Sequence, residues 1–110
     1  MKEDRIYLEH IRECLGHVES FTKSGRDQFL ADRKTQDAVL RNLQTMAESV
    51  SRLSIAVREH RPEVDWRGII GFRNVLVHGY LGINLTRVWR IVEQDVPVLR
   101  AAVEILLAAQ

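Results

Sequence analysis

The sequence is poor in the residues that end helices or cross-link chains. Its 110 residues include one cysteine, two prolines and six glycines. One cysteine cannot form an internal disulfide, so nothing in the sequence requires an oxidising compartment. So few prolines and glycines favour long helices joined by few turns. At this length we expect one domain, spanning residues 1–110.

Long apolar runs are absent as well. No apolar stretch approaches the ~20 residues that a membrane-spanning helix needs, so no membrane association is predicted. The N-terminal segment MKEDRIYLEH is charged throughout and does not resemble a signal peptide. With 45% apolar and 28% charged residues, the composition is typical of a soluble globular protein. We therefore expect a cytoplasmic protein.

Acidic residues are missing from one window, Trp66 to Arg90, which contains four arginines although the net charge of the whole chain is only +1. Such a cationic window favours an anionic partner such as RNA. Arg67, Arg87 and Arg90 are therefore candidate contacts to RNA or to the acidic surface of a protein partner. Solvated surface arginines would produce the same pattern.

Apolar residues recur at spacings of three and four along four long segments, which predicts amphipathic helices. These helices cover about Glu3–Phe21, Arg33–His60, Trp66–His78 and a final segment that begins after Asn84. A short turn is expected around Gln28–Ala31. The predicted fold class is an all-α antiparallel bundle of four main helices, with room for an extra short helix after the first.

Residues at the predicted boundaries support these limits. Asp32, Asp65 and Asn84 precede expected helices, where their side chains can accept hydrogen bonds from free backbone N–H groups. Pro97 lies inside the last helix, where it removes one backbone donor and should kink the helix. Acids and arginines four residues apart on the second helix have the spacing of weak surface ion pairs: Asp37 with Arg41, and Glu48 with Arg52.

The segment GFRNVLVHGY interrupts an apolar helix with an arginine, an amide and an imidazole. Arg73 and His78 are five residues apart, about 140° around an ideal helix, so they do not converge by helix geometry alone. Either Arg73 reaches round the helix, or another surface completes the cleft, and a second copy of the same helix would be a natural supplier.

This pair of side chains has the chemistry needed to split an RNA phosphodiester without a metal. Histidine can transfer protons near neutral pH, and arginine is a fixed cation that can bind phosphate through two hydrogen bonds. The nucleophile can be the 2′-hydroxyl of the RNA itself. An arginine and a histidine on one helix are also common surface residues, so their spacing alone does not establish catalysis.

RNVLVHGY resembles the Arg-x4-His-x-Tyr signature of HepT-like toxins, a branch of the HEPN superfamily of helical-bundle ribonucleases. Arg73, His78 and Tyr80 occupy the three signature positions. The resemblance extends along most of the chain. DAVLRNLQTMAES is similar to the second long helix of the family, PEVDWRGIIGFRN to its approach to the motif, and GINLTRVWRIVEQDVPVLRAAVEIL to its closing helix. One small departure is Ala47, where the family pattern has glycine.

The resemblance implies a metal-independent endoribonuclease that works as a homodimer, with Arg73 and His78 catalytic and with Asn74 and Glu48 as polar support. It implies no cofactor for catalysis. The implied partners are the RNA substrate and an MNT-type minimal nucleotidyltransferase antitoxin, with which the chain could form a larger hetero-oligomer. In this family the antitoxin transfers AMP from ATP to the motif tyrosine, here Tyr80, which would place a bulky anion beside the catalytic pair and block RNA.

Two other functions fit the sequence less well. The chain could be a non-catalytic helical module that serves a minimal nucleotidyltransferase as a substrate-binding or scaffolding subunit. Such a module would not require both Arg73 and His78. A plain structural bundle leaves the acid-free arginine window unexplained, so the toxin ribonuclease is the leading hypothesis.

A second strip of residues on the first helix repeats at spacings of three and four: Tyr7, His10, Cys14, His17 and Phe21. Histidine and cysteine bind zinc, but three ligands from one straight helix rarely close a tetrahedron, so no metal site is predicted. We interpret this strip as packing against another helix, and it is also a candidate surface for a dimer or a partner.

Overall fold

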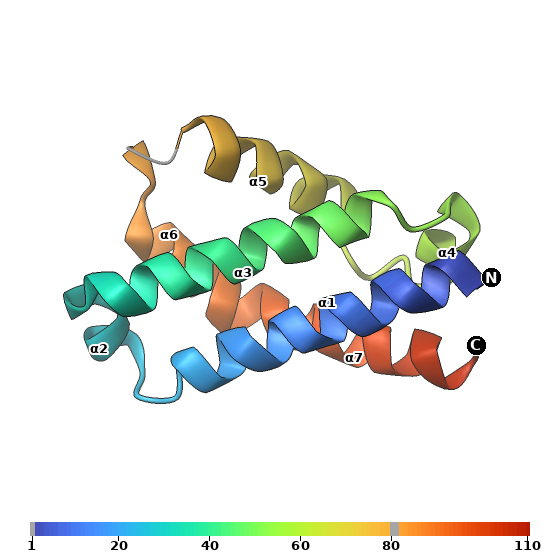
Figure 1. Cartoon of the computed structure of the whole chain (residues 1–110), viewed down its shortest axis with the longest axis horizontal. Helices are drawn as coiled ribbons and strands as arrows, with labels where there is room; N and C mark the ends of the chain where they lie inside the picture. The colour runs from blue at the N-terminus through green and yellow to red at the C-terminus, as the bar shows by residue number, and fades with distance from the viewer. Residues whose placement is uncertain (1, 80–81) are drawn as a thin grey trace.

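A computed structural model of the chain describes residues 2–79 and 82–110, and the long helices in these ranges form a bundle (Figure 1). α1 (Lys2–Phe21) packs against α3 (Arg33–Ser51). α5 (Trp66–His78) lies along α3, and α7 (Val96–Ala108) lies along α1. Each of these pairs runs in opposite directions, which confirms the predicted all-α antiparallel bundle. None of the helices in the described ranges is both long and apolar enough to span a bilayer.

The core contains the apolar stripes that the sequence predicts. Several side chains on α1 and α3 are completely buried: Leu8, Ile11, Leu15, Val18, Val39, Leu43 and Val50. α7 adds Leu99, Val103 and Leu106 to the same core cluster. Full burial of an aliphatic side chain of this size contributes about 1.5–3 kcal/mol. This core fixes α3 against α1, and α3 in turn supports α5.

Local interactions at both ends position α5. The Asp65 carboxylate accepts a hydrogen bond from the backbone N–H of Gly68 at 3.0 Å, which confirms the predicted cap. The buried indole of Trp66 donates to two backbone carbonyl groups of the preceding segment at 2.9 and 3.0 Å. At the other end, the N–H of Gly79 donates to the carbonyl of Val75 at 2.8 Å. α5 therefore has the limits that the sequence predicts.

The prediction of one helix over Arg33–His60 is wrong at its C-terminal end. α3 ends at Ser51, and a separate short helix, α4 (Ile55–Glu59), follows a turn. Leu53 and Val57 are nevertheless buried, at 3% and 7% exposure. The apolar spacing therefore continues across the turn between α3 and α4. For that reason the periodicity alone does not reveal the end of α3.

Asp4, in the first turn of α1, holds this turn in place. Its carboxylate accepts hydrogen bonds from the backbone N–H of Ser54 at 2.8 Å and from the Ser54 hydroxyl at 2.9 Å. The Ser54 hydroxyl oxygen in turn accepts from the N–H of Val57 and caps α4. Asp4 is only 3% exposed, so this contact links two helices through a buried carboxylate.

We expect Asp4→Ala to lower the free energy of unfolding by about 1.5–3 kcal/mol, because it removes a buried charged acceptor from two partly buried donors. Glu3→Ala is a matched control, since it removes an exposed acid from the same helical turn. Urea unfolding followed by circular dichroism measures both variants. Equal losses in the two would show that the contact with Ser54 is not the source of the stability.

The predicted segment between the first two long helices is a short helix, α2 (Arg26–Ala31). Its Phe29 side chain is completely buried and lies against Trp89, with the ring centroids 5.5 Å apart. Asp32 caps α3 as predicted, accepting a hydrogen bond from the N–H of Lys34 at 3.1 Å. α2 thereby links α3 to the C-terminal part of the bundle.

The final helical segment changes geometry before the proline. It consists of α6 (Leu85–Arg90), a π-helical turn η2 (Ile91–Asp95), and α7. Asn84 caps α6 as predicted. The sequence predicts a kink caused by Pro97, and the structure instead has a wider turn immediately before it. Because proline lacks an N–H and its ring crowds the preceding turn, a wider turn accommodates it.

Candidate active site

Arg73 lies on the side of α5 that faces α3. Its Nε donates a short hydrogen bond to the carboxylate of Glu48 on α3, and its Nη1 donates to the side-chain oxygen of Asn74 at 3.3 Å. Glu48 also lies 3.7 Å from the guanidinium of Arg52. About a third of the Arg73 side chain remains exposed, at 34%. The structure thus brings together three of the residues that the resemblance selects and leaves part of the Arg73 side chain exposed.

His78 lies about 1.4 turns further along α5, in its last turn, and is exposed. No described residue hydrogen-bonds to its imidazole. Within the described ranges, no hydrogen bond joins it to Arg73, which agrees with the angle of about 140° between them on an ideal helix. In a single chain, Arg73 is therefore held against α3 while His78 remains accessible from solvent.

Tyr80, the third signature residue, lies outside the described residues. The glycines on either side of this part of the chain, Gly79 and Gly82, are both exposed. The predicted modification of Tyr80 therefore stays a prediction.

The other three candidate arginines are exposed. Arg67 lies in the first turn of α5, whereas Arg87 and Arg90 lie on α6 and line a pocket of about 400 Å³ between α5, α3 and the C-terminal segment. Three acids line the same pocket: Glu63, Asp65 and Asp95. The segment Trp66 to Arg90 contains no acidic residue, but in the folded chain these three acids from outside the segment lie in the same pocket as Arg87 and Arg90.

The strip of histidine and cysteine on α1 faces α3. His10 Nδ1 lies 2.5 Å from the hydroxyl of Ser49, and the Cys14 sulfur lies 3.4 Å from the hydroxyl of Thr45. Cys14 is 3% exposed. Burial raises the pKa of the Cys14 thiol, although its hydrogen bond with Thr45 opposes the effect. The prediction that this strip packs against another helix is confirmed for His10, Cys14 and His17, which contact α3.

This packing narrows the surface that the strip can offer to a dimer or a partner. Tyr7, His10 and Cys14 are partly or fully covered within the chain, with Tyr7 packed against the core. His17 and Phe21 are exposed, although His17 contacts a side chain of α3. Among the described residues, no three His, Cys, Asp or Glu side chains are grouped so as to hold a metal ion.

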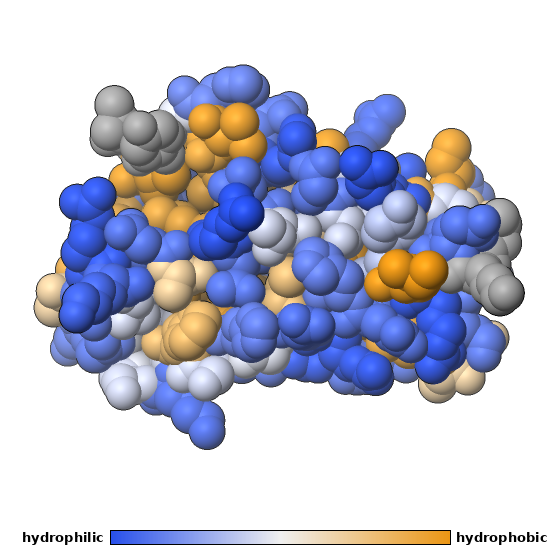
Figure 2. Space-filling view, in the orientation of Figure 1, coloured by the Kyte–Doolittle hydropathy of each residue, from blue (hydrophilic) through white to orange (hydrophobic). Residues whose placement is uncertain are grey.

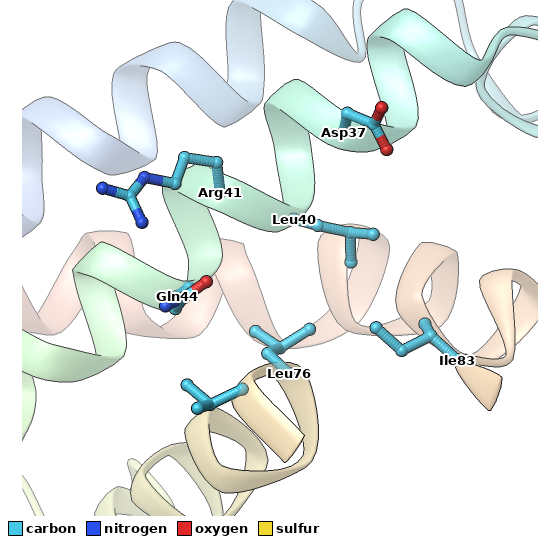
Figure 3. A pocket seen from close by; sticks show the side chains of 7 residues that line it. Asp37, Leu40, Arg41, Gln44, Leu76 and Ile83 are labelled. Atoms are coloured by element: carbon cyan, nitrogen blue, oxygen red, sulfur yellow. The ribbon is translucent and has the colours of Figure 1, made fainter. Parts of the chain in front are cut away.

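A pocket that the sequence does not predict opens between α3 and the C-terminal end of α5 (Figure 3). Its volume is about 300 Å³. Its lining consists of Asp37, Leu40, Arg41, Gln44, Leu76, Val77 and Ile83. Its polar members are Asp37, Arg41 and Gln44, which with Glu48 are spaced by four, three and four residues along α3. Residues at these spacings lie on one face of a helix. This stripe is the signal in the sequence that could have indicated a polar seam beside α5.

The surface ion pairs expected on α3 are half confirmed. Glu48 lies near Arg52 as predicted. Asp37 instead pairs with Arg33, at 3.4 Å, rather than with Arg41. Within the described ranges, Arg41 has no carboxylate at ion-pair distance, so its guanidinium stands free beside the pocket.

A family model described as ribonuclease HepT-like matches residues 11–106. The match covers most of the chain and includes α3 and α5, which carry Arg73, His78 and Glu48. The chain belongs to the HepT-like ribonuclease family. The predicted relationship to the HEPN superfamily is confirmed, and with it the class of helical bundle.

Curated relatives of this HepT-like chain carry ribonuclease names. It is 35% identical over 104 residues to a protein of Thermococcus cleftensis named "probable ribonuclease HepT", covering 94% of each chain. It is 38% identical over 97 residues to a "putative RNase" of Methanocaldococcus jannaschii, covering 87% of this chain and 80% of that one.

A longer relative has a compound name. The chain is 32% identical over 100 residues to a "gamma-glutamylcyclotransferase and putative RNase" of Methanocaldococcus jannaschii, and it spans only 45% of that protein. No solved structure matches the chain. The shared ribonuclease part of these names agrees with an RNA-cleaving function at the level of the family.

Proposed function

We propose that the chain is the toxin of a toxin–antitoxin pair and acts as a metal-independent, homodimeric endoribonuclease. Membership of the HepT-like family supports RNA cleavage in general. The observation that carries the finer proposal is the Arg-x4-His-x-Tyr sequence, whose Arg73 and His78 lie on α5, with Arg73 oriented by Glu48 and His78 exposed. A homodimer would bring a second copy of α5 to the cleft that one copy leaves incomplete.

In the proposed reaction the RNA supplies its own nucleophile. The imidazole of His78 takes the proton of a 2′-hydroxyl, whose oxygen attacks the neighbouring phosphorus. The bond to the 5′-oxygen breaks, and that oxygen takes up a proton from a protonated imidazole. The products carry a 2′,3′-cyclic phosphate and a 5′-hydroxyl. No step needs a metal or another cofactor.

Arg73 would stabilise the charge that develops on the phosphoryl oxygens. A guanidinium can donate two parallel hydrogen bonds to such oxygens, and donors held in place before the reaction are worth more than mobile ones. Glu48 and Asn74 hold the Arg73 guanidinium from two sides. The two residues therefore act through Arg73 as positioning residues.

An MNT-type nucleotidyltransferase would neutralise the toxin by adenylylating Tyr80. The tyrosine oxygen attacks the α-phosphorus of ATP, pyrophosphate leaves, and the phenolic proton passes to solvent. Tyr80 follows His78 by two residues, so the attached AMP would place negative charge beside the cationic site and compete with RNA. ATP serves the antitoxin only.

The test compares RNA cleavage by the purified chain before and after treatment with the antitoxin and ATP. We expect cleavage to persist in EDTA, and to stop once intact mass shows that AMP has been added. Tyr80→Phe should gain no AMP and stay active after the same treatment. AMP added to Tyr80→Phe would place the modification elsewhere, and a chain that cleaves no RNA would favour the non-catalytic binding subunit.

A further inference from the structure

We propose that the pocket between α3 and the end of α5 binds one base of the RNA substrate and selects bases that carry an exocyclic amino group. This inference rests on the proposed ribonuclease function and adds a substrate preference to it. It is carried by the shape of the pocket, by the polar groups on its rim, and by its place beside the catalytic motif.

The pocket has the size and lining of a site for one flat ring system. Its volume of about 300 Å³ is at the lower end of the range for ligand pockets, which are mostly apolar with a few polar groups. Leu40 of α3, Leu76 of α5 and Ile83 extend into the same space (Figure 3). Figure 2 shows hydrophobic residues gathered on the surface between α3 and this end of α5. Such walls fit the faces of a base.

The polar rim offers the groups that recognise the edge of a base. Asp37, Arg41 and Gln44 stand on one face of α3 along the rim. Single-stranded RNA is read by splayed bases that stack on aromatic or guanidinium planes and hydrogen-bond at their edges. Arg41, which has no carboxylate partner in the described part of the chain, can stack on the base or contact its phosphate.

Asp37 supplies the selectivity through Oδ2, because its Oδ1 accepts a hydrogen bond from Arg33 at 3.4 Å. An ionised carboxylate only accepts hydrogen bonds, so it attracts an amino group and repels a carbonyl oxygen. Adenine, cytosine and guanine each carry an exocyclic amino group, whereas both exocyclic groups of uracil are carbonyl oxygens and its one donor on this edge is the ring N3–H. Gln44 both donates and accepts, so it can serve a second position on any of these bases. A uracil bound in the same orientation as cytosine would place a carbonyl oxygen opposite Asp37 where cytosine places its amino group.

The pocket lies next to the proposed catalytic residues along both helices. Val77, in its wall, directly precedes His78 on α5. On the α3 side, Glu48 follows Gln44 by one helical turn, a rise of about 6 Å. Glu48 in turn holds Arg73. A base in the pocket would therefore leave a neighbouring phosphate near the Arg73 guanidinium.

The test measures binding of oligonucleotides that cannot be cleaved. Fluorescein-labelled 2′-O-methyl oligocytidine and oligouridine lack the nucleophilic hydroxyl, and their bases differ in an amino group against a carbonyl oxygen. Fluorescence anisotropy should show about 10-fold tighter binding of oligocytidine by the wild-type chain. Asp37→Asn should bring the ratio near one, because an amide can also donate to uracil.

Asp27→Asn is the matched control, because it removes the same charge from an exposed site on α2 outside the pocket. It should keep the 10-fold ratio. Equal affinity of the wild type for the two oligonucleotides, or equal effects of the two substitutions, would overturn the subsite. Selective binding by a chain that cleaves no RNA would instead reject only the ribonuclease proposal, and cleavage without selectivity would reject only the subsite.

Discussion

His78→Ala is expected to reduce RNA cleavage by about 10²–10⁴-fold, the usual contribution of a positioned proton-transfer group. The imidazole is exposed and no described residue hydrogen-bonds to it, so its removal disturbs little packing. Exposed substitutions of this kind change the free energy of unfolding by no more than about 0.5 kcal/mol. A folded but inactive variant would therefore place the loss in the chemical step.

Single-turnover cleavage of a labelled RNA in EDTA measures this loss. His60→Ala is the control, because His60 is another exposed histidine at a helix end, after α4 and away from the motif. In cells that lack the antitoxin, expression of the wild type should arrest growth and His78→Ala should relieve the arrest. Equal growth with both versions would argue against a toxin ribonuclease.

The limits of α5 could be predicted because all their causes are local. Asp65 caps the first turn through Gly68, three residues away, and a glycine follows the last residue. Signals of such short range can be recognised within a window of a few residues. The position of Arg73 and His78 on one helix, with His78 in its last turn, follows directly from them.

The end of α3 could not be predicted because its cause is distant. Asp4 and Ser54 are 50 residues apart, and their hydrogen bonds depend on the packing of α1 against α3. The apolar spacing meanwhile continues through Leu53 and Val57, which stay in the core. Periodicity reports which residues are buried, and it does not report whether the backbone between them stays helical.

In the candidate site, too, local features could be predicted from the sequence and contacts between distant residues could not. The motif identifies Arg73 and His78, but the contact of Arg73 with Glu48 joins residues 25 positions apart on two helices. The pocket beside α5 takes its walls from α3, α5 and the segment around Ile83, so no single stretch encodes it. Sequence spacing predicts a contact of Glu48 with Arg52, and the structure shows that the one carboxylate contacts both Arg52 and Arg73.

Arg73→Lys is expected to lower the rate of RNA cleavage by about 10²–10³-fold, as is typical when a positioned donor to a developing charge is lost. Lysine keeps the positive charge but cannot present the planar fork that contacts a phosphoryl group through two hydrogen bonds. The Glu48 contact occupies Nε of Arg73, and Nη1 contacts Asn74. A lysine cannot satisfy these contacts and a phosphate together, so both positioning and catalysis should fail.

Arg52→Lys separates this effect from the general effect of replacing a guanidinium that lies beside Glu48. Arg52 shares the Glu48 carboxylate, at 3.7 Å, but lies on α3 outside the signature. Single-turnover rates and RNA affinities of the two variants should diverge, with Arg52→Lys near the wild type in both and Arg73→Lys reduced mainly in rate. A wild-type rate for Arg73→Lys would mean that a positive charge without the planar fork is sufficient for catalysis. Equal losses of rate in the two variants would contradict a specific catalytic role for Arg73. A reduced rate with unchanged affinity would place the Arg73 interaction in the transition state, where catalysis requires it.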